Sequence, residues 1–485
     1  IRQAVCVREK LASGWRMTDD PRRETELWDL RKAGVPLLFR RPGPAQPVPF
    51  IEDVAVPVDR LSEYASRLSD VFDSHGVEAA FYGHAGGGEL HIRPFLDLRK
   101  EEDCRKMESI ADTVCELTRE LGGTLSGEHG EGLARGQFIR RMRPHTYPLF
   151  ERIKRLFDPE GLLNPDKLIS ARQDLLRSDH KFPAPYAPAL PELRFNYAEQ
   201  SYAEIVERCN GCGNCRSPLM YSMCPVFKAT GLEAASPRAK ASVLRNLMYG
   251  RVEERGQWES AWKEIYDYCI GCGMCAVECP SAVDIPKLMY EAKARYASRN
   301  GLDVSGLFLS EADVTCRVMS AFAPLVNAGA RNPMLRKTME MATGVDSRRV
   351  LPRFSRPRTI RTRRNNGKDS PRVALFRDLF ARYNSPELAQ IVVTLIEELT
   401  GSEVLVTDLG SCGITAMAYG NTGSAFRVLE NNLDELSRLV AEGYTVVSQE
   451  PTSVLTLRAE APGWSADPRW KNVAAATIRM AALTR

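Results

Sequence analysis

The chain has 485 residues, a length that predicts roughly three domains of about 150 residues each. Hydrophobic residues make up 44% and charged residues 26%, which excludes a disordered chain, a collagen-like chain and a small disulfide scaffold. The net charge of +4 is too balanced to indicate nucleic acid as the main partner. Mean hydropathy is −0.30, and no apolar run reaches the ~18 residues that would span a bilayer.

The N-terminal region predicts alternating strands and helices. Apolar stretches predict three strands, at 53–58, 77–82 and 89–95. Apolar residues at helical spacing predict a helix that follows Asp59, which can cap it, and a longer helix over 100–121. The order β-α-β-β-α predicts an α+β, ferredoxin-like domain with an antiparallel sheet and helices on one face. Two thiols on the longer helix are expected in its core, Cys104 and Cys115.

Two glycine-rich loops in this region carry three of the six histidines of the chain. The first loop is GHAGGGELH at 83–91, and the second is SGEHGEG at 126–132. Histidine and carboxylate side chains at strand ends are typical ligands of a divalent metal, and a further histidine can accept a substrate proton. The alternative is that these are ordinary glycine-rich turns with surface histidines.

Together with FDPEGLLNPDKL at 157–168, the two loops resemble the C-terminal cap domain of FAD-linked oxidases. The resemblance covers roughly residues 15–170 and includes D-lactate, glycolate and D-2-hydroxyglutarate dehydrogenases. It implies an FAD-binding domain upstream of this chain. The loops depart from the family pattern at Gly87, in place of an aspartate, and at Glu89, in place of an asparagine.

The resemblance also implies roles for individual residues. A divalent metal, Zn or Mn, would be held by His84, His91 and Glu128. His129 would be the base that takes the proton of the substrate 2-hydroxyl. Arg31 would bind the substrate carboxylate, since a guanidinium can donate two parallel hydrogen bonds to the two oxygens of a carboxylate. The segment that folds back towards the flavin would include Asn164 and Lys167.

Eight of the 13 cysteines form two groups in the middle of the chain. The second group reads C-x2-C-x2-C-x3-C-P, which is the bacterial iron–sulfur spacing, and the first has the same order with a longer gap before its last cysteine. The predicted ligands are Cys209, Cys212, Cys215 and Cys279 for one 4Fe–4S cluster, and Cys269, Cys272, Cys275 and Cys224 for the other. Two zinc knuckles are the alternative, although zinc usually takes thiols in C-x2-C pairs.

Helical spacing at 237–249, 259–268 and 284–296 surrounds these motifs. The arrangement resembles the all-α ferredoxin module, in which helices separate the two motifs. The predicted domains are 1–171 for the cap domain, 172–196 for a proline-rich spacer, 197–300 for the cluster module, 301–370 for a linker and 371–485 for a partial α/β domain.

The C-terminal part predicts strands at 373–376, 403–407 and 445–448 and helices at 386–399 and 424–440. It resembles the first half of a cysteine-rich CCG domain, with Ser411 and Ser453 in place of cysteines, so Cys412 alone could not hold a cluster. The linker before it ends in an arginine run, Arg348 to Arg364, whose interpretations are a solvated segment or a docking site for an acidic partner or membrane surface.

The sequence therefore predicts an FAD-dependent oxidoreductase that oxidises a D-2-hydroxy acid. Its electrons would pass through two 4Fe–4S clusters to a quinone, a flavoprotein or a cytochrome. A non-catalytic iron–sulfur electron-transfer subunit is the alternative, and a regulatory paralogue with a decayed site is a third hypothesis. Residue 1 is Ile and no signal-peptide pattern follows, so the chain resembles the C-terminal part of a longer protein or a processed piece. Clustered thiols indicate metal ligation in a reducing compartment, and we expect a cytoplasmic location, with peripheral association at the inner face of the membrane as an option.

Overall fold

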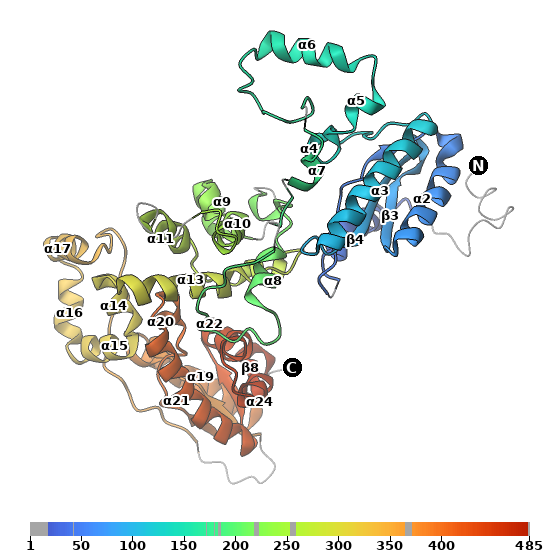
Figure 1. Ribbon diagram of the computed structural model, residues 1–485. Helices are drawn as coiled ribbons and strands as arrows, with labels where there is room; N and C mark the ends of the chain where they lie inside the picture. Colours follow the sequence, from blue (N-terminus) through green and yellow to red (C-terminus); the bar gives the residue numbers. More distant parts are fainter. Residues whose placement is uncertain are drawn as a thin grey trace. The chain divides into compact units, whose positions relative to one another are not determined.

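The computed structural model describes residues 18–483 apart from 42, 171, 179, 183–185, 218–222, 253–258 and 364–370. The chain divides into two compact units, Ile1–Pro188 and Ala189–Arg485 (Figure 1). Cys6, two prolines of the predicted spacer (183 and 185) and Arg364 lie outside the described residues.

An antiparallel sheet forms the centre of the first unit. Its main hairpin joins β3 (Ala79–His84) to β4 (Glu89–Leu96), with His84 paired with Glu89. Two short strands, β1 (Gln46–Pro47) and β2 (Val54–Ala55), also pair with β4. The predicted antiparallel sheet is confirmed, but the strand predicted at 53–58 is reduced to Val54–Ala55, and a 3-10 helix begins at its last residue, Val58.

Two helices pack together beside this sheet, as Figure 1 shows. Helix α2 (Leu61–His75) buries Tyr64, Leu68 and Phe72. Helix α3 (Glu101–Glu120) buries an apolar stripe that includes both predicted core thiols, which are 4% and 0% exposed. The predicted cap of α2 is wrong: its N-cap position is Arg60, without a side-chain cap, since Asp59 belongs to the preceding 3-10 helix.

The remaining helices of this unit lie on either side of that α+β core in the sequence. Helix α1 (Pro21–Leu38) begins after Asp20, whose carboxylate accepts the amide hydrogen of Arg22. After the sheet come α4 (Gly132–Gly136), α5 (Ile139–Met142), α6 (Tyr147–Phe157) and α7 (Leu175–Ser178). Helix α7 falls in the predicted spacer, yet its Leu175 and Leu176 are buried.

Short helices build the first part of the second unit. They are α8 (Tyr202–Glu207), α9 (Pro225–Thr230), α10 (Pro237–Met248), α11 (Glu259–Asp267), α12 (Met274–Glu278) and α13 (Ile285–Asn300). Their common core includes Val206, Leu244 and Met289, and several cluster cysteines pack against it. The three predicted helices of this module are confirmed as α10, α11 and α13.

The segment predicted as a linker, 301–370, carries four helices in its first part. They are α14 (Val304–Ser310), α15 (Ala312–Ala321), α16 (Ala323–Gly329) and α17 (Pro333–Thr343). Side-chain caps start two of them: Asp303 accepts the amide hydrogen of Gly306, and Asn332 accepts those of Met334 and Leu335. The arginine run begins after α17, in chain without regular structure.

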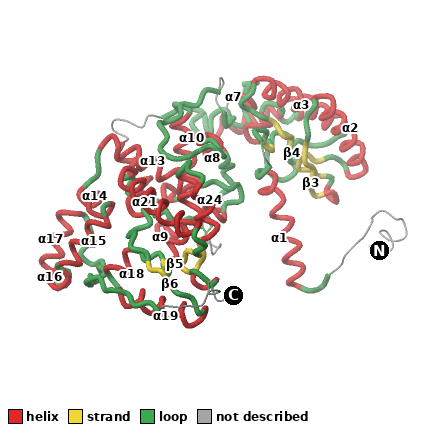
Figure 2. The backbone as a smooth tube through the Cα atoms, turned by 90° about the horizontal axis from the view of Figure 1, so that it is seen from below, coloured by secondary structure: helices red, strands yellow, loops and turns green. Residues whose placement is uncertain are grey.

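A parallel sheet lies near the end of the chain, and the predicted α/β class is confirmed. Its order is β6 (Val404–Val406), β5 (Val373–Leu375), β7 (Thr445–Ser448) and β8 (Thr477–Arg479). Helices surround it in Figure 2, among them α19 (Pro386–Thr400), α21 (Thr422–Ala441) and α24 (Arg469–Ala476). Phe195, predicted as spacer, packs into the core of this part beside Trp464. Among the described helices, none is both long and apolar enough to cross a bilayer.

Candidate active site and cluster-binding cavities

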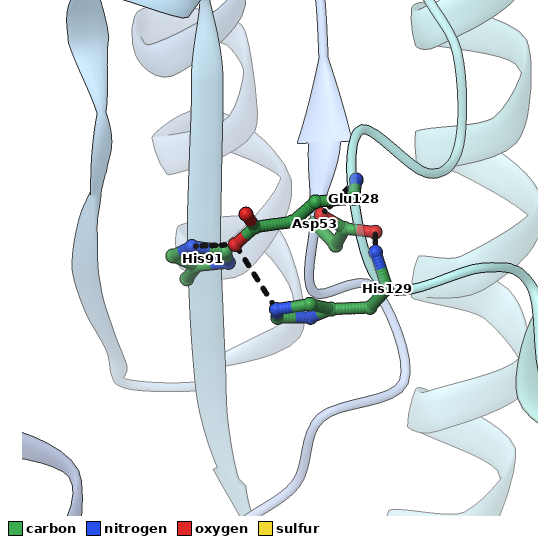
Figure 3. Close-up of side chains that lie close together, drawn as sticks. All are labelled: Asp53, His91, Glu128 and His129. Atoms are coloured by element: carbon green, nitrogen blue, oxygen red, sulfur yellow. Dashed lines mark hydrogen bonds and ion pairs between the residues drawn. The ribbon is translucent and has the colours of Figure 1, made fainter.

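The two glycine-rich loops bring three histidines around one carboxylate. The Oε1 atom of Glu128 lies 3.1 Å from His129 Nε2, 3.4 Å from His91 Nε2 and 3.7 Å from His84 Nε2. The rings of His91 and His129 stack with their centroids 5.0 Å apart. The histidines singled out in the sequence therefore share one site, and Figure 3 shows the Glu128 carboxylate joined by dashed lines to both His91 and His129.

Backbone geometry explains the glycines of the first loop. A Cβ atom at Gly83 would lie 2.3 Å from the carbonyl oxygen of Glu89, and one at Gly88 would lie 2.0 Å from that of Val56. Gly88 also has a φ of +72°, a conformation that side chains disfavour. These two positions let the hairpin turn tightly, so that His84 at the end of β3 faces His91 on β4, with ring centroids 5.3 Å apart.

Asp53 fixes the second loop, and the sequence reasoning missed it. Its Oδ2 accepts hydrogen bonds from Ser126 Oγ and, at 2.8 Å, from the His129 amide, and its Oδ1 accepts one from the Glu128 amide at 3.0 Å. Its backbone carbonyl accepts the Gly127 amide at 2.7 Å. Asp53 is fully buried with a φ of +75°. Its role arises from contacts with a loop far along the sequence, which no local motif reveals.

Glu89, the departure from the family pattern, forms a carboxyl pair with Asp53. The hydrogen bond to Asp53, together with burial, raises the pKa of Glu89 to about 7. Burial raises the pKa of Asp53 as well, but the hydrogen bonds that it accepts outweigh burial and hold that pKa far below its usual value. Asp53 is therefore the ionised partner. Glu89 Oε1 lies 3.8 Å from His91 Nε2, so this carboxyl group does belong to the site.

The donor set fits a divalent cation. One ligand atom from each of Asp53, His91, Glu128 and His129 lies within 4.8 Å of the others. Within the described residues, the buried atoms His91 Nδ1 and Glu89 Oε1 have no hydrogen-bond partner. Burial lowers the pKa of His91, which favours the neutral imidazole that binds metals. The geometry thus adds Asp53 to the predicted set and brings His129 within ligand distance, whereas His84 lies outside this group of four.

The side chain of Tyr82 lies between the predicted substrate arginine and this cluster. The Arg31 guanidinium on α1 is 5.1 Å from the centroid of the Tyr82 ring, which in turn is 5.1 Å from the His91 ring. The two predicted flavin-contacting residues, Asn164 and Lys167, are exposed in the chain that follows α6. Among the described contacts, neither of them touches the histidine cluster.

The eight cluster cysteines line two cavities in the second unit. The first is lined by Cys209, Cys212, Cys215 and Cys279, and also by Cys275. The second is lined by Cys224, Cys269, Cys272 and Cys275. Cys275 lines both cavities, and the other lining cysteines divide into three of one motif with the last of the other, in agreement with the pairing that the spacing predicts for two 4Fe–4S clusters.

The surroundings of these thiols suit metal ligation. Burial raises the pKa of Cys215 to about 11 and raises that of Cys275 further, so thiolates there need a metal or cluster to be stable. The Arg238 amide donates to the Cys215 sulfur. Gly271 has a φ of +69°, and a Cβ atom there would lie 2.0 Å from Tyr290 Oη. Small residues thus keep the backbone close to the site of the cluster.

Comparison with known proteins gives two domain matches. Residues 3–168 match the family described as FAD linked oxidases, C-terminal domain, and residues 205–283 match the 4Fe-4S dicluster domain. A D-2-hydroxyglutarate dehydrogenase of Pseudomonas putida is 26% identical over 92% of this chain and 49% of its own length. A D-lactate dehydrogenase of Archaeoglobus fulgidus is 33% identical over 24% of this chain and 26% of its own.

A third relative matches a smaller part of the chain. It is one of the subunits of the anaerobic glycerol-3-phosphate dehydrogenase of Escherichia coli, and it is 28% identical over 38% of this chain and 47% of its own length. This chain spans about half the length of the D-2-hydroxyglutarate dehydrogenases that it matches. Along the chain, the match to the C-terminal domain of the FAD-linked oxidases precedes the match to the 4Fe–4S dicluster domain.

Proposed function

We propose that the protein to which this chain belongs is an FAD-dependent dehydrogenase that oxidises a D-2-hydroxy acid and passes the electrons through two 4Fe–4S clusters. One observation carries the proposal: a histidine–carboxylate cluster and two four-cysteine cavities occur in the same chain. The cluster of histidines can take a proton, and the cavities can hold an electron path. D-2-hydroxyglutarate is the first substrate to test, since relatives that align over 92% of the chain carry that name.

Different residues of the first unit bind the metal, take the substrate proton and bind the substrate carboxylate. When bound, FAD supplies the acceptor for the hydride of C2, and a divalent metal lowers the pKa of the 2-hydroxyl group. His91, Glu128 and Asp53 would hold the metal, with His84 at the exposed rim of the site. His129 takes the hydroxyl proton on Nε2, and the Glu128 carboxylate 3.1 Å away stabilises the resulting imidazolium. Arg31 binds the substrate carboxylate.

The residues of the second unit hold the clusters. Cys209, Cys212, Cys215 and Cys279 ligate one, and Cys224, Cys269, Cys272 and Cys275 ligate the other. We propose a quinone, a flavoprotein or a cytochrome as the acceptor, and a cytoplasmic protein. The exposed arginines between 348 and 363 offer a surface that an anionic membrane could attract.

The decisive experiment is an anaerobic visible spectrum of the full-length protein, recorded before and after adding a panel of D-2-hydroxy acids. We expect flavin bands over a broad cluster absorbance, and we expect one acid to bleach both. The L-enantiomer of the same acid is the control and should leave the spectrum unchanged. A flavin that no D-2-hydroxy acid reduces would overturn the proposed substrate class.

The second candidate function is an electron-transfer protein without its own dehydrogenase site. The likeness to the glycerol-3-phosphate dehydrogenase subunit favours it, but that likeness covers 38% of the chain. It gives no reason for the cluster of Asp53, His91, Glu128 and His129. The same spectrum separates the two candidates, because an electron-transfer protein of this kind would show cluster absorbance with no flavin and no bleaching by any hydroxy acid.

A further inference from the structure

The second cysteine cavity has a buried lysine beside it. Lys240 on α10 is 2% exposed and lines this cavity together with its four cysteines. Its Nζ donates to the carbonyl oxygen of Ala235 at 2.6 Å and to that of Ala234 at 3.3 Å. Within the described part of the chain it forms no ion pair with a carboxylate. Burial lowers the pKa of Lys240, and the thiolates of Cys269, Cys224 and Cys275 oppose that effect by favouring the charged ammonium.

A second ammonium group lies on the same side. Lys293 on α13 donates to the carbonyl oxygen of Cys269 at 3.0 Å. Burial lowers the pKa of Lys293 as well, and the Cys269 thiolate, followed by Asp267, favours its protonated form. Two lysines from different helices therefore converge on the cluster held by Cys224, Cys269, Cys272 and Cys275.

The cations near the other cavity are arranged differently. Arg238 lines that cavity, but its guanidinium pairs with Glu233 at 2.9 Å, and Arg216 pairs with the same carboxylate at 2.6 Å. Arg245 donates to the carbonyl oxygen of Cys209 at 3.3 Å and is partly exposed. A carboxylate and water thus weaken the positive field at the first cavity, whereas Lys240 is shielded from both.

The difference in local positive charge affects the reduction potentials of the two clusters. Four thiolates give each cluster a net negative charge, and every added electron makes that charge more negative. A buried positive charge stabilises the reduced form more than the oxidised form, and charge is one of the factors that set cluster potentials. Asp284 also acts on Cys275, but burial raises the pKa of Asp284, which weakens its opposing charge.

We propose that Lys240, assisted by Lys293, raises the reduction potential of the cluster held by Cys224, Cys269, Cys272 and Cys275 above that of its neighbour. Electrons then reach that cluster after its neighbour, and leave the protein from it. The inference rests on the proposed function for the presence of both clusters. Each transfer moves one electron from the reduced cluster to the oxidised one, with no bond made and no proton passed.

The position of a third cavity agrees with this order. A cavity of about 430 Å³ borders the same cluster and is lined by Cys269, Lys293, Tyr296 and Tyr419, among others. An acceptor, or part of one, that enters this space would lie next to Cys269, a ligand of the second cluster. A cluster next to such an opening is well placed to deliver electrons.

The test is a redox titration of the full-length protein followed by electron paramagnetic resonance of the reduced clusters. The wild-type protein should show two midpoint potentials. We expect Lys240→Met to shift the higher one downward, towards the lower, with the lower one unchanged. Lys240→Arg keeps the charge and should restore most of the separation. Lys287→Met is the matched control, since Lys287 is a partly buried lysine on α13 that donates to the Asn196 carbonyl and has no cysteine among its charged neighbours.

The inference would be overturned if Lys240→Met had the same two midpoint potentials as Lys287→Met. It would also be overturned if Lys240→Met shifted the lower midpoint potential instead of the higher one. If Lys240→Met loses its iron, Lys293→Met provides the same measurement at a less buried position, with the same expected downward shift. Reduction by a D-2-hydroxy acid in the same sample keeps the two proposals apart. Clusters with normal potentials but no bleaching would contradict the dehydrogenase, whereas bleaching without a shift would contradict only the role of Lys240.

Discussion

At the scale of single residues, the site combines side chains that motifs reveal with one that they do not. His84, His91, Glu128 and His129 stand in two recognisable loops, and the structure brings all four together. Asp53 stands in no motif, because its function is to hold the amides of a loop that follows 75 residues later. Chemistry-bearing residues could be predicted from the sequence, but the residue that supports them depends on the tertiary fold.

We expect His129→Ala to lower turnover of the full-length enzyme by roughly 10²- to 10⁴-fold, the usual contribution of a general base. Iron content should stay at the wild-type level, because His129 does not line either cysteine cavity. Steady-state kinetics with D-2-hydroxyglutarate provide the measurement. His75→Ala is the control, since this histidine sits at the end of α2 and bonds to Val71 and Ser109. Turnover that survives in His129→Ala would show that another group is the base.

We expect Asp53→Asn to loosen the second loop. Asparagine tolerates the positive φ of this position, so the change tests the hydrogen bonds and not the backbone conformation. The amide group of asparagine cannot accept the hydrogen bonds of both carboxylate oxygens, a loss of about 1–3 kcal/mol for buried groups. Hydrogen exchange at the Glu128 and His129 amides should accelerate. Exchange as slow as in the exposed-surface control Asp70→Asn would contradict this role.

At the scale of elements, long helices with a regular apolar stripe could be predicted, and short elements could not. Helices α2, α3, α10, α13, α19 and α21 appear close to their predicted positions. Strands β1 and β8 have two and three residues, too few for a period to emerge, and they exist because β4 and β7 offer free edges. Helices α14 to α17 are short, and α14, α16 and α17 begin at a side-chain cap or a proline, so the segment has no single helical period.

Helix α6 leads to a prediction about the rest of the protein. Its apolar side chains are exposed, with Leu156 at 76% and Phe157 at 77%, and the chain after it adds Leu162 at 73%. We expect the FAD-binding part of the full-length enzyme to cover this face. Burial of one leucine side chain stabilises by about 1.5–3 kcal/mol, so Leu156→Gln should weaken flavin retention by roughly tenfold or more.

The flavin-to-protein ratio after gel filtration is the measurement for Leu156→Gln. Leu399→Gln is the matched control, because Leu399 on α19 is 56% exposed and belongs to the second unit. Equal flavin loss in the two variants would argue against contact between α6 and the flavin-binding part.

At the scale of the whole molecule, the chain consists of two units with separate cores, divided between Pro188 and Ala189. The spacer predicted at 172–196 straddles this division, since Leu175 packs in the first unit and Phe195 in the second. Composition revealed the prolines of this stretch but not the apolar residues that anchor it on both sides.

We expect residues 189–485, produced alone under anaerobic conditions, to fold and to bind both clusters. All eight cluster cysteines and both of their cavities belong to this unit. Iron and sulfide analysis should give eight of each per chain, the content of two 4Fe–4S clusters. Residues 197–300 are the comparison, and they should bind less because they lack Phe195 and the C-terminal core that it joins. A soluble 189–485 fragment without iron would contradict the independence of this unit.

The crossed use of the cysteines has a consequence for the lifetime of the protein in air. Each cavity takes its fourth cysteine from the opposite motif, so two clusters close two interlocked loops of the chain. Opening one loop releases the entropy that its closure had cost and frees the segment that positions a ligand of the other cluster. Oxidative loss of one cluster should therefore destroy the second soon afterwards, and protein with a single cluster should be a short-lived species in cells exposed to oxygen.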